Sequence, residues 1–134
     1  MKKSIVYLDD DPGCLDIFEL TLDDEYEVRT ATTPDVARRM LTERVADIII
    51  SDQSMPAIKG EDFLREVAEK YPASCRVMLT GQALMGGMIR EVSTGIINLF
   101  IPKPWIEQNM RRMLERACLS LEVRSHEMRV AEAD

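Results

Sequence analysis

Five residues with carboxylate, hydroxyl or amine side chains stand where hydrophobic runs of the 134-residue sequence end. They are Asp9, Asp10, Asp52, Thr80 and Lys103. Carboxylates that lie close together repel one another unless a cation lies among them. Oxygen ligands suit Mg²⁺ or Mn²⁺, which prefer octahedral coordination. We therefore expect a Mg²⁺ or Mn²⁺ site if folding brings the five side chains together.

The same residue types could carry phosphoryl chemistry. A carboxylate can attack phosphorus and form an aspartyl-phosphate. The phosphoryl oxygens then need neutralising by metal on one side and by an ammonium and a hydroxyl on the other, and Lys103 and Thr80 supply these groups. Each residue alone has a simpler explanation as a cap, a turn residue or a solvated lysine, so the prediction depends on their convergence.

Alternating strands and helices are predicted to provide that convergence. Hydrophobic runs predict strands over residues 5–8, 26–30, 47–52, 75–79 and 97–101. Helical spacing between the runs predicts a doubly wound α/β fold, with a parallel sheet and helices on both faces. Because the carboxyl ends of parallel strands share one edge, the five side chains should meet in one crevice there.

Helical periodicity also predicts which hydrophobic side chains point into the core. The first helix should bury Cys14, Ile17, Phe18 and Leu22, and the last should bury Ile106, Met110, Met113, Leu114 and Ala117. A helix predicted over residues 83–94 contains Gly86–Gly87, each less favourable than Ala by about 1 kcal/mol. These glycines suit either a helix that shifts during switching or one that packs closely on the sheet.

Composition excludes several classes of function. The net charge of −7 argues against a nucleic-acid-binding surface and against attraction to anionic membranes. No signal peptide or membrane-spanning run is visible, so we expect a cytoplasmic location. Cys14, Cys75 and Cys118 are widely separated, which predicts buried, reduced thiols. The glycine-rich motifs of common nucleotide sites do not occur.

Four motifs resemble the receiver domain of bacterial two-component response regulators, over residues 4 to about 118. In family order they are Leu8–Pro12, Ser51–Pro56, Met78–Gly81 and Phe100–Trp105. The resemblance implies a flavodoxin-like (βα)5 fold with strand order 2-1-3-4-5. It also implies phosphorelay signal transduction, with a phosphoryl group received from a sensor histidine kinase or a phosphotransfer protein.

The resemblance assigns Asp52 as the phosphorylation site. It implies that Asp10 binds the metal directly and Asp9 mostly through water, with Asp52 and the backbone carbonyl of Ser54 completing the protein ligands. We expect self-phosphorylation and autodephosphorylation chemistry only, rather than an enzyme that turns over a separate substrate.

The resemblance gives Thr80 and Lys103 the catalytic role of binding the phosphoryl oxygens. Thr80 and Phe100 fall at the family's switch positions, where the aromatic ring turns inward when the hydroxyl moves. The implied output surface comprises the helix over residues 83–94, the strand over 97–101 and the following helix. A homodimer or an output domain would contact this surface or the C-terminal helix.

The sequence divides into a receiver domain over residues 1–118 and a C-terminal helical extension, or the start of a linker, over residues 119–134. Helix-forming residues continue to Ala133 without a breaker. This segment suits either a frayed, solvated terminal helix or a signalling helix that leads to a dimer contact or an output domain.

Two other functions fit parts of the pattern. A haloacid-dehalogenase-like phosphatase would use Asp9 as the nucleophile and Asp11 as the general acid, but it would leave Asp52 without a role. It would also need a further acidic motif after Lys103, and residues 104–134 contain none at the end of a strand. The second is a receiver that binds partners without ever accepting phosphate.

Overall fold

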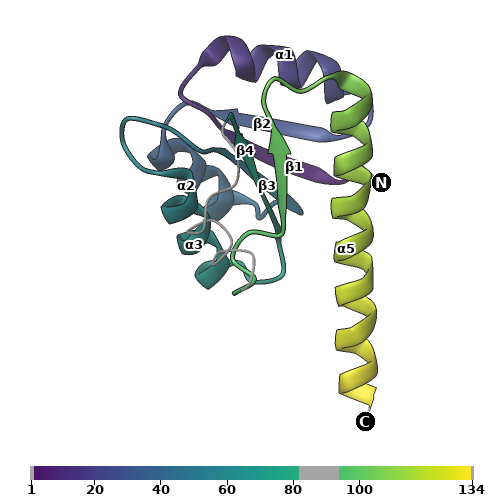
Figure 1. Ribbon diagram of the computed structural model, residues 1–134. Helices are drawn as coiled ribbons and strands as arrows, with labels where there is room; N and C mark the ends of the chain where they lie inside the picture. The colour runs from purple at the N-terminus through teal and green to yellow at the C-terminus, as the bar shows by residue number, and fades with distance from the viewer. Residues whose placement is uncertain (1, 82–93, 134) are drawn as a thin grey trace.

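The computed structural model describes residues 2–81 and 94–133, with side chains as far as Val123. A central sheet is covered by helices on both faces, and α5 extends well beyond the sheet (Figure 1). The described strands are β1 (Ser4–Leu8), β2 (Glu27–Ala31), β3 (Ile48–Asp52), β4 (Cys75–Thr80) and β5 (Leu99–Pro102). The described helices are α1 (Pro12–Leu22), α2 (Pro34–Glu43), α3 (Gly60–Lys70) and α5 (Glu107–Ala133). Residues 83–93 of the helix predicted over residues 83–94 lie outside the described part of the chain.

The five described strands are parallel and lie in the order 2-1-3-4-5, which confirms the predicted flavodoxin-like fold. β3 lies in the middle, with Ile50 opposite Tyr7 of β1 and Val77 of β4. Its five residues are all buried, as expected for a strand that is covered on both faces. The sheet therefore holds Asp52, the last residue of β3, at the centre of one edge.

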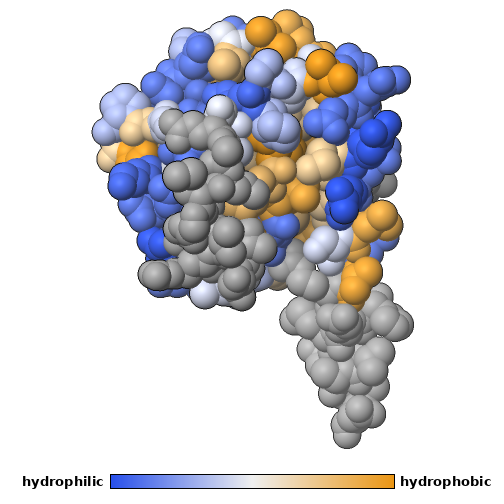
Figure 2. Space-filling view, in the orientation of Figure 1, coloured by the Kyte–Doolittle hydropathy of each residue, from blue (hydrophilic) through white to orange (hydrophobic). Residues whose placement is uncertain are grey.

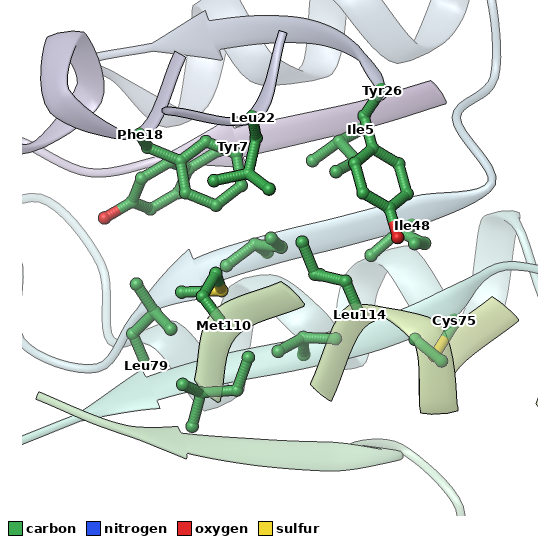
Figure 3. Packing of buried hydrophobic residues seen from close by; sticks show 14 of the residues in the cluster. Ile5, Tyr7, Phe18, Leu22, Tyr26, Ile48, Cys75, Leu79, Met110 and Leu114 are labelled. Carbon is green, nitrogen blue, oxygen red and sulfur yellow. The ribbon is translucent and has the colours of Figure 1, made fainter. Parts of the chain in front are cut away.

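Side chains of each central strand alternate between two hydrophobic cores. Ile5 and Tyr7 of β1 pack on the α1 and α5 side, whereas Val6 and Leu8 pack on the α2 and α3 side. Figure 3 shows the first core, in which Met110 and Leu114 of α5 point toward the sheet. The sheet is thus covered on both faces, which is what doubly wound topology requires.

Side-chain hydrogen bonds cap the first two helices at their N-termini. The carboxylate of Asp11 accepts from the backbone N–H of Gly13 at 2.9 Å and caps α1. The Thr33 hydroxyl accepts from the backbone N–H of Val36 at 3.3 Å and caps α2, with Pro34 as its first residue. The cap on α1 fixes the direction of the chain directly after Asp9 and Asp10.

Two of the predicted core residues are exposed, and two others, Cys14 and Met113, are only partly buried. Ile17 of α1 is 60% exposed and Ile106 is 67% exposed. The buried residues of α1 are Leu15, Phe18 and Leu22, and Ile17 lies about 100° around the helix from Phe18. Ile106 precedes the first turn of α5, so it does not share the buried face of that helix.

The fifth strand begins two residues later than the sequence suggests. The side-chain Oδ1 of Asn98 accepts from the backbone N–H of Arg76 at 2.7 Å, in place of a backbone carbonyl. Regular pairing therefore starts at Leu99, although the Ile97 side chain is buried. Gly95, which precedes this segment, has φ of 79°, a left-handed conformation that glycine adopts without strain.

All three cysteines are free thiols, as predicted, but only Cys75 is buried. Hydrophobic surface is visible in Figure 2 over α1 and along α5 next to its grey end. The exposed hydrophobic side chains of these two helices include Ile17, Leu20, Leu119 and Val123. Among the described residues, no helix has the length and hydrophobicity needed to cross a membrane.

Replacing Leu114 with alanine should lower the free energy of unfolding by about 3 kcal/mol. Its side chain is fully buried between α5 and the sheet, so truncation would leave a cavity (Figure 3). Urea denaturation would measure the loss. Leu119→Ala on the same helix is the matched control, because Leu119 is 60% exposed and should change stability by less than about 0.5 kcal/mol. Equal losses in the two variants would contradict the packing of α5.

Candidate functional site

The carboxyl ends of β1, β3, β4 and β5 bring the predicted site residues to one edge of the sheet. Asp9 follows β1, Asp52 ends β3, Thr80 ends β4 and Lys103 follows β5. The Nζ atom of Lys103 lies 2.6 Å from Oδ1 of Asp52, although 51 positions separate the two residues. Parallel topology thus produces the predicted convergence.

Three carboxylates at this edge form an acidic group suited to a divalent cation. Asp9, Asp10 and Asp52 each offer an oxygen, and these oxygens lie within 4.8 Å of one another. With the single ammonium of Lys103 beside them, the formal charge is three negative against one positive, a net −2. Asp9 and Asp52 are buried and Asp10 is exposed, so the group is open to solvent on one side. Oxygen donors and this charge fit Mg²⁺ or Mn²⁺.

Lys103 links two of these carboxylates. Its Nζ donates to Asp52 and also lies 3.7 Å from Oδ2 of Asp9. Partial burial by itself lowers the pKa of the Lys103 ammonium, but the hydrogen bond to Asp52 and the charges of Asp52 and Asp9 outweigh it and raise the pKa overall. Lys103 therefore stays positively charged at neutral pH, as a group that binds an anion must.

Asp9 is held by two donors that the sequence analysis did not identify. The Tyr7 hydroxyl donates to its Oδ2 at 2.7 Å, and the backbone N–H of Asp11 donates to its Oδ1 at 3.0 Å. Burial, followed by the hydrogen bond to Asp9, raises the pKa of Tyr7 far above its ordinary value, so its hydroxyl keeps its proton. Only 1% of the Asp9 side chain is exposed, so these contacts fix its orientation.

Asp11 has a structural role next to the site. Hydrogen bonds from the Cys14 thiol and from the backbone N–H of Gly13 lower the pKa of its carboxyl group. A general acid must carry a proton when it reacts, and a low pKa opposes this. The phosphatase alternative would also need Asp9 as its nucleophile, and the near-complete enclosure of the Asp9 side chain disfavours this.

A pocket of about 310 Å³ opens beside Asp52. Its described lining residues are Asp52, Gln53, Ser54, Gly81 and Lys103. Ser54, whose carbonyl is a predicted metal ligand, thus borders the same space as the aspartate. The Asp52 side chain, which lines the pocket, is 10% exposed, whereas the Asp9 side chain is 1% exposed.

Gly60, the first residue of α3, packs against the backbone that carries Asp52. A Cβ atom at this position would lie 2.3 Å from the carbonyl oxygen of Asp52 and 3.0 Å from Cα of Gln53. The Gly60 N–H also donates to the Gln53 carbonyl at 3.0 Å. This close approach holds the segment after β3 and shapes one wall of the pocket.

The two predicted switch residues lie on the same side of neighbouring strands. Phe100 of β5 pairs with Met78 of β4, and Thr80 lies two residues after Met78, on the same face of the sheet. Phe100 is half-buried and packs against the core on the α2 and α3 side. The hydroxyl of Thr80 donates to Oε1 of Gln53, a contact that the sequence analysis did not anticipate.

A flavodoxin-like sheet with an acidic group and a lysine at its carboxyl edge defines a class of signalling domain. A family model for the response regulator receiver domain matches residues 5–115. The chain therefore belongs to the response regulator receiver domain family.

Curated relatives of the chain include a transcriptional regulatory protein and a response regulator. The chain is 32% identical over 107 residues to the hydrogenase transcriptional regulatory protein HoxA of Cupriavidus necator, covering 80% of the chain and 22% of that protein. It is 27% identical over 137 residues to the response regulator Rre1 of Synechocystis, covering 96% of the chain and 59% of that protein. The chain thus spans about a fifth of the first relative and about three fifths of the second.

Solved structures share the fold. A structure described as adenylate cyclase from Rhodopirellula baltica superposes with a TM-score of 0.91 at 19% identity, covering all of both chains. The chemotaxis protein CheY4 of Vibrio cholerae superposes with a TM-score of 0.81 at 25% identity, covering 87% of this chain and 99% of that one. The first likeness, being under 25% identical, bears on the fold alone.

Replacing Tyr7 with phenylalanine should weaken Mg²⁺ binding about tenfold, because Asp9 would lose the hydroxyl that orients it. Isothermal titration of Mg²⁺ into the protein would measure the affinity. Tyr26→Phe is the matched control, since its hydroxyl contacts Cys118 in the same core and no described site residue. Unchanged Mg²⁺ affinity in Tyr7→Phe would show that Asp9 does not depend on this contact.

Proposed function

We propose that this domain receives a phosphoryl group on Asp52 in a Mg²⁺-dependent phosphorelay. The observation that supports this most directly is the contact of Lys103 Nζ with Asp52 Oδ1 at 2.6 Å, beside the carboxylates of Asp9 and Asp10. Among these three aspartates, Asp52 borders the pocket and accepts the hydrogen bond from the Lys103 ammonium. It is therefore the best placed to act as a nucleophile.

In the proposed reaction, an oxygen of Asp52 forms a bond to phosphorus while the bond from phosphorus to the leaving group breaks. The leaving group is the histidine imidazole of a histidine kinase or phosphotransfer protein, or acetate when acetyl phosphate is the donor. Lys103 moves from the carboxylate to a phosphoryl oxygen, and the Thr80 hydroxyl donates a hydrogen bond to another. A divalent cation held by Asp9, Asp10, Asp52 and the Ser54 carbonyl would neutralise the remaining charge.

The proposed output runs from Thr80 to Phe100 and then to the surface of β5 and α5. Thr80 and Phe100 lie on neighbouring strands and face the same side of the sheet. Movement of the Thr80 side chain would therefore change the room available to the Phe100 ring. α5 is a single helix from Glu107 to Ala133, which extends the domain beyond residue 118. We propose that residues 1–118 form the receiver and that residues 119–134 carry the signal to a second copy or to an output domain.

Incubation with Mg²⁺ and acetyl phosphate, followed by intact-mass measurement, tests the proposal. We expect one phosphoryl adduct in the wild-type protein, no adduct in Asp52→Asn, and no adduct when EDTA removes the metal. Asp62→Asn is the control, because Asp62 lies in the first turn of α3 and its carboxylate pairs with Arg65. Absence of an adduct in the wild-type protein would favour a receiver that only binds partners. Steady release of phosphate that requires Asp9 but not Asp52 would favour a phosphatase.

A further inference from the structure

The hydroxyl of Thr80 is engaged with a side chain outside the predicted site. It donates to Oε1 of Gln53, the residue that directly follows Asp52. Thr80 is only 5% exposed, and Gln53 lines the pocket beside Asp52. The hydroxyl is therefore directed along the edge of the sheet, from the end of β4 toward the segment that leaves β3.

The backbone of Gln53 is held on two sides. Its N–H donates to the Leu79 carbonyl at 3.0 Å, and its carbonyl accepts from the Gly60 N–H at 3.0 Å. The absence of a side chain at Gly60 allows this second contact, because a Cβ there would collide with Asp52. The Gln53 side chain thus starts from a fixed position, so its amide oxygen is presented to Thr80 with little loss of backbone entropy.

A threonine hydroxyl has one proton to donate. Phosphoryl oxygens bound to Asp52 would only accept hydrogen bonds, as does Oε1 of Gln53, so both compete for the same proton. We infer that Gln53 is a positioning residue that holds the Thr80 hydroxyl in its unphosphorylated arrangement and thereby weakens the response to phosphorylation. This inference rests on the proposed function.

The expected effect is modest. Gln53 and Thr80 each take part in further interactions, so this hydrogen bond is one of several that hold them. Loss of one neutral acceptor should change the equilibrium by about three- to tenfold. The direction of the change in affinity is informative, because removal of a polar contact near a binding site ordinarily weakens binding, whereas tighter binding is expected here.

A double-mutant cycle with Gln53→Met and Thr80→Val tests the inference. Methionine keeps the length of glutamine and removes the amide. Binding of beryllium trifluoride, a mimic of an acyl phosphate, is measured by calorimetry on the full chain with saturating Mg²⁺. We expect Gln53→Met to tighten binding about three- to tenfold, and to have no effect when Thr80 is already valine. Mg²⁺ affinity without the mimic should be the same in the wild-type protein and in Gln53→Met.

Three results would overturn the inference. Weaker or unchanged binding in Gln53→Met would mean that Gln53 does not restrain the hydroxyl. An equal gain with and without the Thr80 hydroxyl would mean that Gln53 acts by another route. Failure of the wild-type protein to bind the mimic would overturn the proposed function and this inference with it, whereas the first two results leave the proposed function intact.

Discussion

Replacing Gly60 with alanine should lower the free energy of unfolding by about 2–3 kcal/mol and slow phosphorylation of Asp52. The added Cβ would lie 2.3 Å from the Asp52 carbonyl oxygen, which belongs to backbone and cannot rotate away. Either α3 or the end of β3 must move, and overpacking of this kind costs about 1–3 kcal/mol. Helix propensity alone predicts the opposite sign, a gain of about 1 kcal/mol for Gly→Ala within a helix.

Gly81→Ala is the matched control for this variant. Gly81 also lines the pocket beside Asp52, but a Cβ there would meet no described atom within 4 Å. Gly60→Ala should have a lower free energy of unfolding in urea than Gly81→Ala. It should also have a lower initial rate of adduct formation with acetyl phosphate. If Gly60→Ala were as stable and as reactive as Gly81→Ala, the close packing of α3 on the end of β3 would be wrong.

Replacing Lys103 with methionine should slow phosphorylation by acetyl phosphate about a hundredfold, the usual effect of removing one group that stabilises developing negative charge. Methionine keeps most of the length of the side chain without its charge. Removal of the ammonium also leaves three carboxylates without their balancing cation, so Mg²⁺ should bind more tightly. The same variant would therefore gain metal affinity and lose reactivity.

Rates come from the time course of the adduct mass, and metal affinity from calorimetry. Lys70→Met is the control, because Lys70 is exposed at the end of α3 and should leave both quantities unchanged. A rate in Lys103→Met that matched the control would remove Lys103 from the proposed reaction. Weaker Mg²⁺ binding would contradict the account of the charges at the site.

The fold could be predicted because each strand and helix carries its own pattern. Residues 48–50 are three isoleucines in succession, a pattern typical of a strand that is buried on both faces of a sheet. Once strands and helices alternate, parallel pairing follows, and the ends of the strands must share an edge. This topological step brought Asp52 and Lys103 together in the prediction, with no knowledge of any distance between them.

Features that depend on the detailed fit of side chains could not be predicted in this way. Ile17 has the right polarity for the core, yet only one stripe of α1 faces the sheet. The contact of Tyr7 with Asp9 could have been predicted from their spacing, because residues two apart in a strand point to the same side. The contact of Gln53 with Thr80 has no such sequence pattern. It joins side chains of two different segments and depends on the rotamer that the Gln53 side chain adopts.

Trp105 gives the site an intrinsic optical reporter. It is the single tryptophan of the chain, and it lines a groove with Cys14, Ile17 and Lys103. Its ring packs edge-on against Phe18, with 6.0 Å between the ring centroids. The Phe18 and Tyr7 ring centroids are 4.9 Å apart, and the Tyr7 hydroxyl donates to Asp9. Displacement of Lys103 or of the aromatic rings would alter the surroundings of one indole, so its fluorescence emission should follow occupation of the site in real time without any attached dye.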